Sequence, residues 1–534
     1  MIQPADMIIT NARALTLDPA QPHAQAVAIV GARIAFVGSS AGAERLCGPA
    51  TRVIDAGGRT LLPGIIDSHY HLEIGSLKLD DIRFEGARSY GDVVGAVRAY
   101  AAAHAQRPWL AGYGLNYNVL PGHGLTRHDL DQIVADRPLL VVAFDLHTAW
   151  ANTRALELAG LLQGGFCEPG NEIVMAADGT ASGELREPGA YNQVMALLPA
   201  PDESQVRALL HKGLAEAARY GITSIHNMDG DMTQMTRYLA LEDCGELSLR
   251  ISVPYLVTPD TALDSLGEAL AMRAAETELV RGGRVKFFMD GVIESCTALL
   301  LDDYADQPGD RGAAIFSAEQ FTPLATEADR LGLQIAVHAI GDAAIRRALD
   351  GFTQAQRING QRDSRHRIEH IELLHPDDLP RFQELGVIAS MQPLHAAISE
   401  PGQVWARRVG AERWGCGFPW QTLRESGAYV VFGSDWPVVT QNPFLAMHAA
   451  MARQPWAPGQ PRQAQTLEAT LAAYTRDAAY AEFQEDLKGQ LRAGMLADLA
   501  LLSGDLETLP VDELADMTAA LTICNGRIVY EDMR

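Results

Sequence analysis

The chain has 534 residues, of which 47% are hydrophobic and 21% are charged. This composition is that of a folded protein, and the chain is too long for one simple core, because single cores stop growing near about 250–300 residues. Its 43 Lys and Arg residues against 67 Asp and Glu residues give a formal net charge of −24 at pH 7. Such an acidic protein would repel the phosphates of nucleic acids and of anionic membranes, so we expect neither as a partner.

The first residues of the chain and its cysteines indicate the cellular compartment of the protein. The first ten residues contain Asp6 but no Lys or Arg, unlike the positively charged start of a signal peptide. No apolar run approaches the roughly 18–20 residues that cross a bilayer. The six cysteines are scattered without a Cys-x-x-Cys motif, which is typical of free thiols in a reducing compartment. The sequence therefore predicts a cytoplasmic protein.

Both ends of the chain have the pattern of short strands and tight turns. Strand-sized apolar runs occur at residues 7–10, 26–30, 33–37, 497–502, 521–524 and 527–530. The last two runs flank Asn525-Gly526, and Asn-Gly between apolar runs is the strongest short hairpin signal. Neither end has enough strands for a stable sheet of its own. We therefore predict one small β-sandwich domain built from residues 1–62 and 487–534.

Between these ends, strand-sized apolar runs alternate with amphipathic, helix-sized stretches. Strands are predicted at residues 64–71, 221–227, 249–257, 284–290, 333–338, 366–371, 386–392 and 429–435. Repeated strand–helix alternation predicts a parallel sheet, and eight units predict an α/β fold of the (β/α)8 TIM-like barrel type over residues 63–486.

The first connection of this barrel, residues 72–220, is far longer than an ordinary loop and must carry its own structure. It is predicted to be a lid over the active site, with Trp109, Tyr113 and Tyr117 as an apolar wall. The alternative is an oligomer interface, and a homodimer is a possible assembly.

Metal-binding residue types recur where the predicted strands end, which is the end that carries the active site in such barrels. The first strand ends in His69-Tyr70-His71, and strand alternation places both imidazoles on one face. The fifth, sixth and eighth strands end in His338, His370 and Asp435. One such residue is most often a hydrogen-bonded core residue, but agreement across several strands is not explained by chance.

Lys286 lies inside the apolar run of the fourth strand, residues 285–290. Burying a charged lysine is costly unless it is paired, and burial lowers its pKa towards that of a neutral amine at neutral pH. A neutral amine can add carbon dioxide to form a carbamate, whose oxygens can bridge two metals. The alternative is a lysine paired with a carboxylate such as Asp290. Together with the imidazoles and Asp435, this donor set suits two divalent ions, with zinc the best match.

These residues lie in segments that resemble the amidohydrolase superfamily, specifically amidohydrolase family 3, the branch that includes enzymes like N-substituted formamide deformylase. The matching segments are residues 62–71, 147–152, 286–291, 338–342, 365–370, 392–395, 433–438 and 494–499. By this resemblance, the first metal is bound by His69, His71, Lys286 and Asp435. The Lys286 carbamate bridges to a second metal, which is bound by His338 and His370. Asp435 is also the catalytic residue that shuttles the proton.

The resemblance implies a metal-dependent hydrolase of a carbon–nitrogen bond, of the amide type and other than a peptide bond, in a small molecule. A bound divalent ion lowers the pKa of water from about 15.7 to about 7 and so supplies hydroxide at neutral pH. The alternatives are a hydrolase of cyclic amides or lactams and a deaminase of the same superfamily. Substrate contacts are expected from Tyr113, His147, Glu294, Cys296, His395 and Trp436.

Two of these regions depart from the family pattern, at Glu294-Ser295-Cys296-Thr297 and at Asp145-Leu146 before His147. Both departures fall in loops expected to face the substrate, so the substrate is left open.

Overall fold

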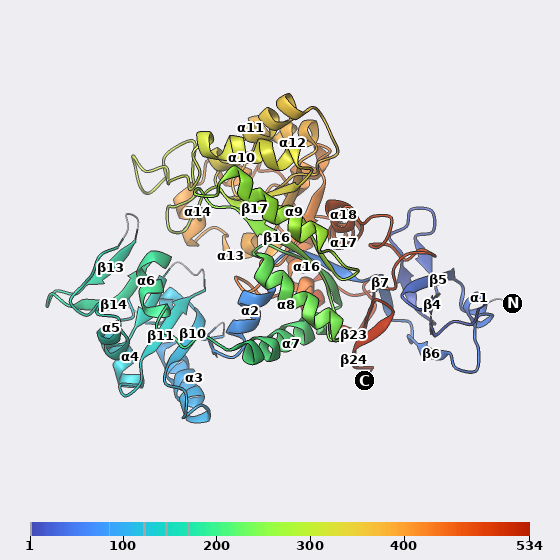
Figure 1. The fold of residues 1–534 in the computed structure, drawn as a ribbon, viewed down its shortest axis with the longest axis horizontal. Helices are drawn as coiled ribbons and strands as arrows, with labels where there is room; N and C mark the ends of the chain where they lie inside the picture. Colours follow the sequence, from blue (N-terminus) through green and yellow to red (C-terminus); the bar gives the residue numbers. More distant parts are fainter. Residues whose placement is uncertain (1–2, 85, 121–123, 145–147, 168–170, 534) are drawn as a thin grey trace. The chain divides into compact units, whose positions relative to one another are not determined.

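The computed structural model of the protein describes residues 3–84, 86–120, 124–144, 148–167 and 171–533 (Figure 1). The chain forms two compact units. One comprises Met1–His71, Leu214–Trp436 and Thr440–Arg534, and the other comprises Leu72–Gly213 with Pro437–Val439. None of the described helices combines the length and the apolar character that crossing a membrane requires.

The first unit contains an eight-stranded parallel sheet whose strands follow one another in space as they do in sequence. They are β8 (Ile65–Tyr70), β15 (Ile222–Asn227), β16 (Arg250–Leu256), β17 (Val280–Phe288), β18 (Gln334–Ala339), β19 (Arg367–His370), β20 (Ile388–Met391) and β21 (Val430–Phe432). The sheet closes where Tyr70 bridges to Trp436 and where the amide of Asp435 donates to the carbonyl of His69 at 2.7 Å. Each predicted strand is present, and the barrel is confirmed.

Helices connect these strands, as the alternating pattern predicts. They include α8 (Met232–Asp243), α9 (Gly267–Ala274), α10 (Ala318–Arg330), α11 (Asp342–Asn359), α12 (Leu379–Leu385) and α15 (Trp420–Glu425), of which α10 and α11 lie side by side outside the sheet (Figure 1). Helix α10 begins at a capping box, in which Ser317 and Gln320 satisfy each other's backbone amides.

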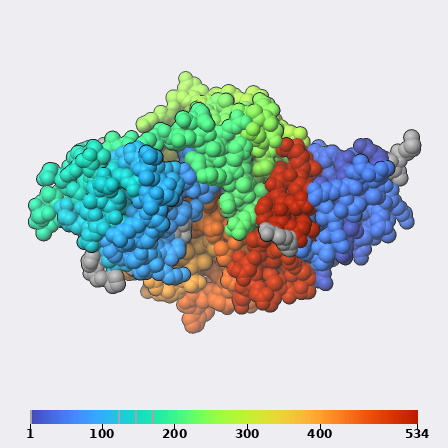
Figure 2. Space-filling view, turned by 90° about the horizontal axis from the view of Figure 1, so that it is seen from below, coloured from blue at the N-terminus to red at the C-terminus, as the bar shows by residue number. Residues whose placement is uncertain are grey.

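The two ends of the chain build two further sheets together. One has the order β5 (Arg33–Gly38), β4 (Ala26–Val30), β1 (Met7–Thr10), β6 (Arg52–Asp55), and the other has the order β24 (Arg527–Glu531), β23 (Ala519–Cys524), β22 (Leu499–Leu502), β7 (Thr60–Pro63), β2 (Arg13–Leu15), β3 (His23–Ala24). Strand β22 pairs antiparallel with β7, so the end of the chain lies beside its start (Figure 2). Residues of both sheets, such as Ile9, Val27, Leu61 and Leu499, share one core.

The predicted fold class is thereby confirmed. These sheets and the barrel form one compact unit, so the domain boundaries at residues 62 and 487 stay predictions. A buried ion pair joins the two parts, because Arg250 at the start of β16 donates at 2.7 Å to Asp498, which directly precedes β22.

The second unit, which apart from Pro437–Val439 falls within the long first connection, has its own sheet and cores. Its strand order is β13 (Glu172–Met175), β14 (Ala181–Arg186), β12 (Thr148–Ala151), β11 (Leu139–Ala143), β10 (Leu110–Leu115), β9 (Ile82–Arg83), and its helices include α3 (Tyr90–Ala103), α4 (Arg127–Ile133), α5 (Thr153–Leu158) and α6 (Pro188–Met195). Strand β11 alternates between two cores, with Leu139 and Val141 in one and Leu140 and Val142 in the other. This connection therefore carries its own structure, and its role as a lid stays a prediction.

Candidate metal centre

Asp435 lies where the barrel closes, three residues beyond the end of β21. Its backbone is left-handed, with φ of 61°, and the strand ends at Phe432, earlier than predicted. Gly433 permits the close approach of this segment to β8, because a Cβ there would lie 2.3 Å from the amide nitrogen of His69. The carboxylate is thereby held beside the two histidines at the end of β8.

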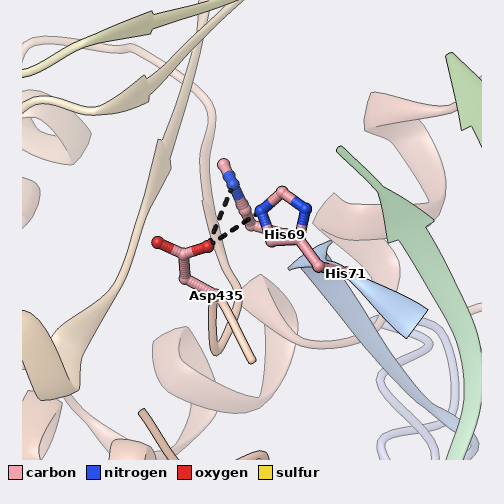
Figure 3. A group of neighbouring side chains, drawn as sticks. All are labelled: His69, His71 and Asp435. Carbon is pink, nitrogen blue, oxygen red and sulfur yellow. Dashed lines mark ion pairs between the residues drawn. The ribbon is translucent and has the colours of Figure 1, made fainter. Parts of the chain in front are cut away.

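Each oxygen of the Asp435 carboxylate faces histidine. Oδ1 lies 3.4 Å from Nε2 of His69 and 3.1 Å from Nε2 of His71 (Figure 3). Oδ2 lies 3.6 Å from Nε2 of His395 and 3.9 Å from Nδ1 of His370. Among the described residues, two groups could therefore hold a metal ion, namely His69, His71 and Asp435, and His370, His395 and Asp435.

The Nδ1 atoms of these four imidazoles are held by side-chain acceptors. The pairs are His69 with Glu369 at 2.8 Å, His71 with Asp229 at 2.6 Å, His370 with Gln392 at 2.9 Å and His395 with Glu372 at 3.4 Å. A carboxylate oxygen accepts the hydrogen bond, so Nδ1 of His69, His71 and His395 carries a proton and Nε2 is the ring atom that faces Asp435. Metal-binding histidines are oriented by partners of this kind.

The electrostatics of the centre favour the neutral form of His69 and His338, the charged form of His71 and an ionised Asp435. Burial lowers the pKa of His69 to about 4 and that of His338 to about 3. Burial would also lower the pKa of His71, but the hydrogen bonds with Asp229 and Asp435 outweigh it and raise that pKa to about 9. Burial would raise the pKa of Asp435, but the adjacent His69 and His71 hold it well below its usual range.

Lys286 is fully buried in β17, and its Nζ has no hydrogen-bond partner among the described residues. Burial lowers its pKa to about 8, against the attraction of Glu369 and Asp435. The alternative pairing with Asp290 is wrong, because Asp290 lies beyond the end of the strand and its carboxylate accepts the backbone amides of Leu299, Ile340 and Gly341.

His338 lies at the end of β18 with its ring centre 4.4 Å from that of His370. Its Nε2 is 3.2 Å from the carbonyl of Gly291, which can only accept, so Nδ1 is the nitrogen that carries the lone pair. Lys286 and His338 belong to neither of the two groups, and their roles as ligands stay predictions.

The predicted substrate contacts lie in different surroundings. Trp436 is buried, with its ring centre 5.1 Å from that of Tyr70 where the barrel closes. Glu294 and Cys296 lie in the loop after β17, where Cys296 is half-buried with φ of 60°. Tyr113 lies on β10 of the second unit, with Nζ of Lys78 4.6 Å from its ring centre. His147 lies outside the described residues, and all these roles in substrate binding stay predictions.

Sequence reasoning missed the residues that orient the histidines. Asp229 follows β15 by two positions, so the same search for polar residues at strand ends would have found it. Arg367 and Glu369 lie two apart on the buried strand β19 and form a hydrogen-bonded ion pair at 2.5 Å. Two opposite charges on one face of an apolar strand are the sequence pattern that would have indicated this buried ion pair.

The donor set fits a divalent metal. Imidazole and carboxylate ligands are those of zinc and similar ions. The buried Nζ of Lys286 and Nε2 of His395 have no hydrogen-bond partner among the described residues, which leaves donor atoms for an ion. A closed (β/α)8 barrel with two such groups around one strand-end aspartate is the arrangement of a metal-dependent barrel protein.

Residues 52–530 match the amidohydrolase family, and the chain belongs to this family. The predicted resemblance and the predicted enzyme class, a hydrolase of carbon–nitrogen bonds other than peptide bonds, are thereby confirmed. Protein LONG AFTER FAR-RED 3 of Arabidopsis thaliana is 29% identical to the chain, covering 98% of this chain and 92% of that protein. N-substituted formamide deformylase of Arthrobacter pascens is 27% identical, covering 99% of both. The crystal structure of an uncharacterized metal-dependent hydrolase from Pyrococcus horikoshii OT3 has a TM-score of 0.75 at 25% identity, covering 95% of this chain and 99% of that one.

Proposed function

We propose that the protein hydrolyses a carbon–nitrogen bond of the amide type in a small molecule, with two divalent metal ions, zinc being the best match, as cofactors. The observation that carries this proposal is the Asp435 carboxylate, which faces histidines from both of its oxygens. Similarity to the N-substituted formamide deformylase over 99% of both chains supports amides as the substrate class.

Divalent ions bound here would lower the pKa of water to about 7 and polarise the substrate carbonyl. Asp435 is ionised, so it takes the proton of the attacking water and then delivers it to the leaving nitrogen. An amide nitrogen leaves poorly unless it is protonated, and one carboxylate therefore serves both halves of the reaction. Glu369 and Asp229 keep His69 and His71 in orientation throughout.

A substrate panel tests this function. Metal-replete protein is assayed with N-substituted formamides, acylated amines, hydantoins, lactams and aminopurines, and the release of amine, ring opening and the release of ammonia are measured separately. Amine release from a linear amide supports the proposal. Ring opening alone supports the cyclic-amide alternative, and ammonia release alone supports the deaminase.

The cellular compartment of the enzyme and the kind of partner it binds are also proposed. All six cysteines are free thiols, which supports the cytoplasm as the compartment. The net charge of −24 supports a small-molecule substrate without a nucleic-acid or membrane partner.

Alanine in place of Lys286 is expected to lower bound metal and abolish activity, because the carbamate oxygens proposed to bridge the ions are lost. Acetate or propionate should restore part of the activity by supplying a carboxylate in their place. The matched control is Lys488, a second buried lysine, whose Nζ is 2.6 Å from Glu482. Lys488→Ala should lower stability without rescue by acetate. An unmodified Lys286 in a metal-loaded crystal structure would contradict the proposal.

The role of residues 72–220 can be tested by kinetics. If they form a lid, Tyr113→Ala and Tyr117→Ala should change KM or kcat for good substrates, because an apolar wall contributes to substrate binding. Unchanged kinetics combined with a change of oligomeric state in solution would favour the interface instead.

A further inference from the structure

His395 shares with His226 a buried Nε2 that has no hydrogen-bond partner among the described residues, but Nε2 of His226 faces Glu482 at 3.4 Å, whereas that of His395 faces Asp435. His395 lies on α13 (Pro393–Ile398). His366, directly before β19, is also buried, but its Nδ1 accepts from the amide of Ile335 at 3.1 Å and its Nε2 lies 3.1 Å from Asp329. A buried polar atom left unpaired costs about 1–3 kcal/mol. Among the described residues, Nε2 of His395 therefore makes no hydrogen bond that would offset this cost.

The orientation of His395 is fixed by a chain of contacts behind it. Its Nδ1 is 3.4 Å from Oε1 of Glu372, and Oε2 of Glu372 accepts from Nε1 of Trp405 at 2.9 Å. Trp405 lies on α14 (Val404–Val409) and is fully buried. The arrangement repeats that of His69 with Glu369, in which a carboxylate held by a second side chain orients the imidazole.

Nε2 of His395 points towards the oxygen of Asp435 that His69 and His71 do not use. It lies 3.6 Å from Oδ2, and its ring lies parallel to that of His370, with the ring centres 5.9 Å apart. Oδ1 faces His69 and His71 instead, so the two oxygens of one carboxylate face two separate pairs of imidazoles.

We propose that His395 is a metal ligand, and that Asp435 is shared between two ions, with His69 and His71 at one and His370 and His395 at the other. This assigns His395 to the metal rather than to the substrate. It also gives the two ions a bridging carboxylate besides the proposed Lys286 carbamate. The inference rests on the proposed function only in assuming that divalent ions bind.

Metal binding without substrate tests this assignment. Wild type, His395→Gln and His366→Gln are stripped of metal and titrated with zinc in competition with a chromophoric chelator, and metal content is measured by plasma mass spectrometry. We expect His395→Gln to lose the second ion or to bind it at least about 10-fold more weakly. His366→Gln should bind as wild type does, because His366 faces Asp329 instead of Asp435. The cobalt-loaded His395→Gln protein should also have an altered visible absorption spectrum.

Glu372→Gln is a second variant, with which the proposal can still be tested if His395→Gln fails to fold. Loss of the carboxylate that orients His395 should weaken the second ion by about 10–100-fold. Binding of both ions with wild-type affinity and an unchanged cobalt spectrum, in either folded variant, would overturn the proposal. Since no substrate is used, this outcome is independent of the substrate panel.

Discussion

Asparagine in place of Asp435 is expected to lower kcat by at least about 10²-fold while the fold and at least one bound metal are retained. The substitution keeps the shape of the side chain and one ligand oxygen, but it removes the base. Asp435 is ionised because His69 and His71 hold its pKa well below its usual range. Steady-state kinetics of the metal-replete variant measure the change, which should fall on kcat more than on KM.

Asp329→Asn is the control for this substitution. Asp329 is a buried aspartate that contacts His366 and Arg362 away from Asp435, so its amide variant should lose stability but retain kcat. A well-folded, metallated Asp435→Asn enzyme with near wild-type kcat would mean that another residue, such as His370 or His395, moves the proton.

Methionine in place of Arg367 is expected to lower the free energy of unfolding by about 3–5 kcal/mol, because it leaves a buried charge without its partner. Arg367 and Glu369 are both fully buried, and the guanidinium of Arg367 contacts both oxygens of Glu369. It also donates to the carbonyl of Ser68 at 2.5 Å and to Oγ of Ser390 at 2.6 Å. Urea unfolding of the wild type and variant side by side measures the difference.

The same variant should bind metal more weakly, because Glu369 orients His69. Arg250→Met is the matched control, since it breaks the buried pair with Asp498 and should lower stability without changing metal affinity. The double variant Arg367→Met with Glu369→Gln should recover part of the stability, because no charge is then left unpaired. A loss below about 1 kcal/mol for Arg367→Met would show that water or another group compensates Glu369.

The sequence was most informative where local pattern decides the structure. The barrel strands could be predicted because each is an apolar run bounded by polar residues, and the sandwich because strands at both ends lacked partners nearby. A closed barrel brings the ends of its strands together whatever the structure of its loops. The sequence could therefore predict that one cluster contains Asp435, His69 and His71.

The remaining features depend on backbone geometry that no local pattern reveals. The orientation of His395 depends on where α13 lies and on Glu372 and Trp405, which are separated from it by loops. Lys286 could be recognised as a buried lysine, but its lack of a partner could be seen only after Asp290 was found to accept three backbone amides. The positive φ of Asp435, which directs its carboxylate between the imidazoles, is likewise not evident from the sequence.

The most direct test of the account is to measure metal content and hydrolysis in the same preparation. The protein is purified with zinc and analysed for metal, then stripped with a chelator and reloaded, with hydrolysis of a substrate from the panel followed at each stage. We expect about two ions per chain, loss of hydrolysis on stripping, and its return with zinc. One ion per chain would contradict the binuclear centre, and hydrolysis that survives complete removal of metal would contradict the account as a whole.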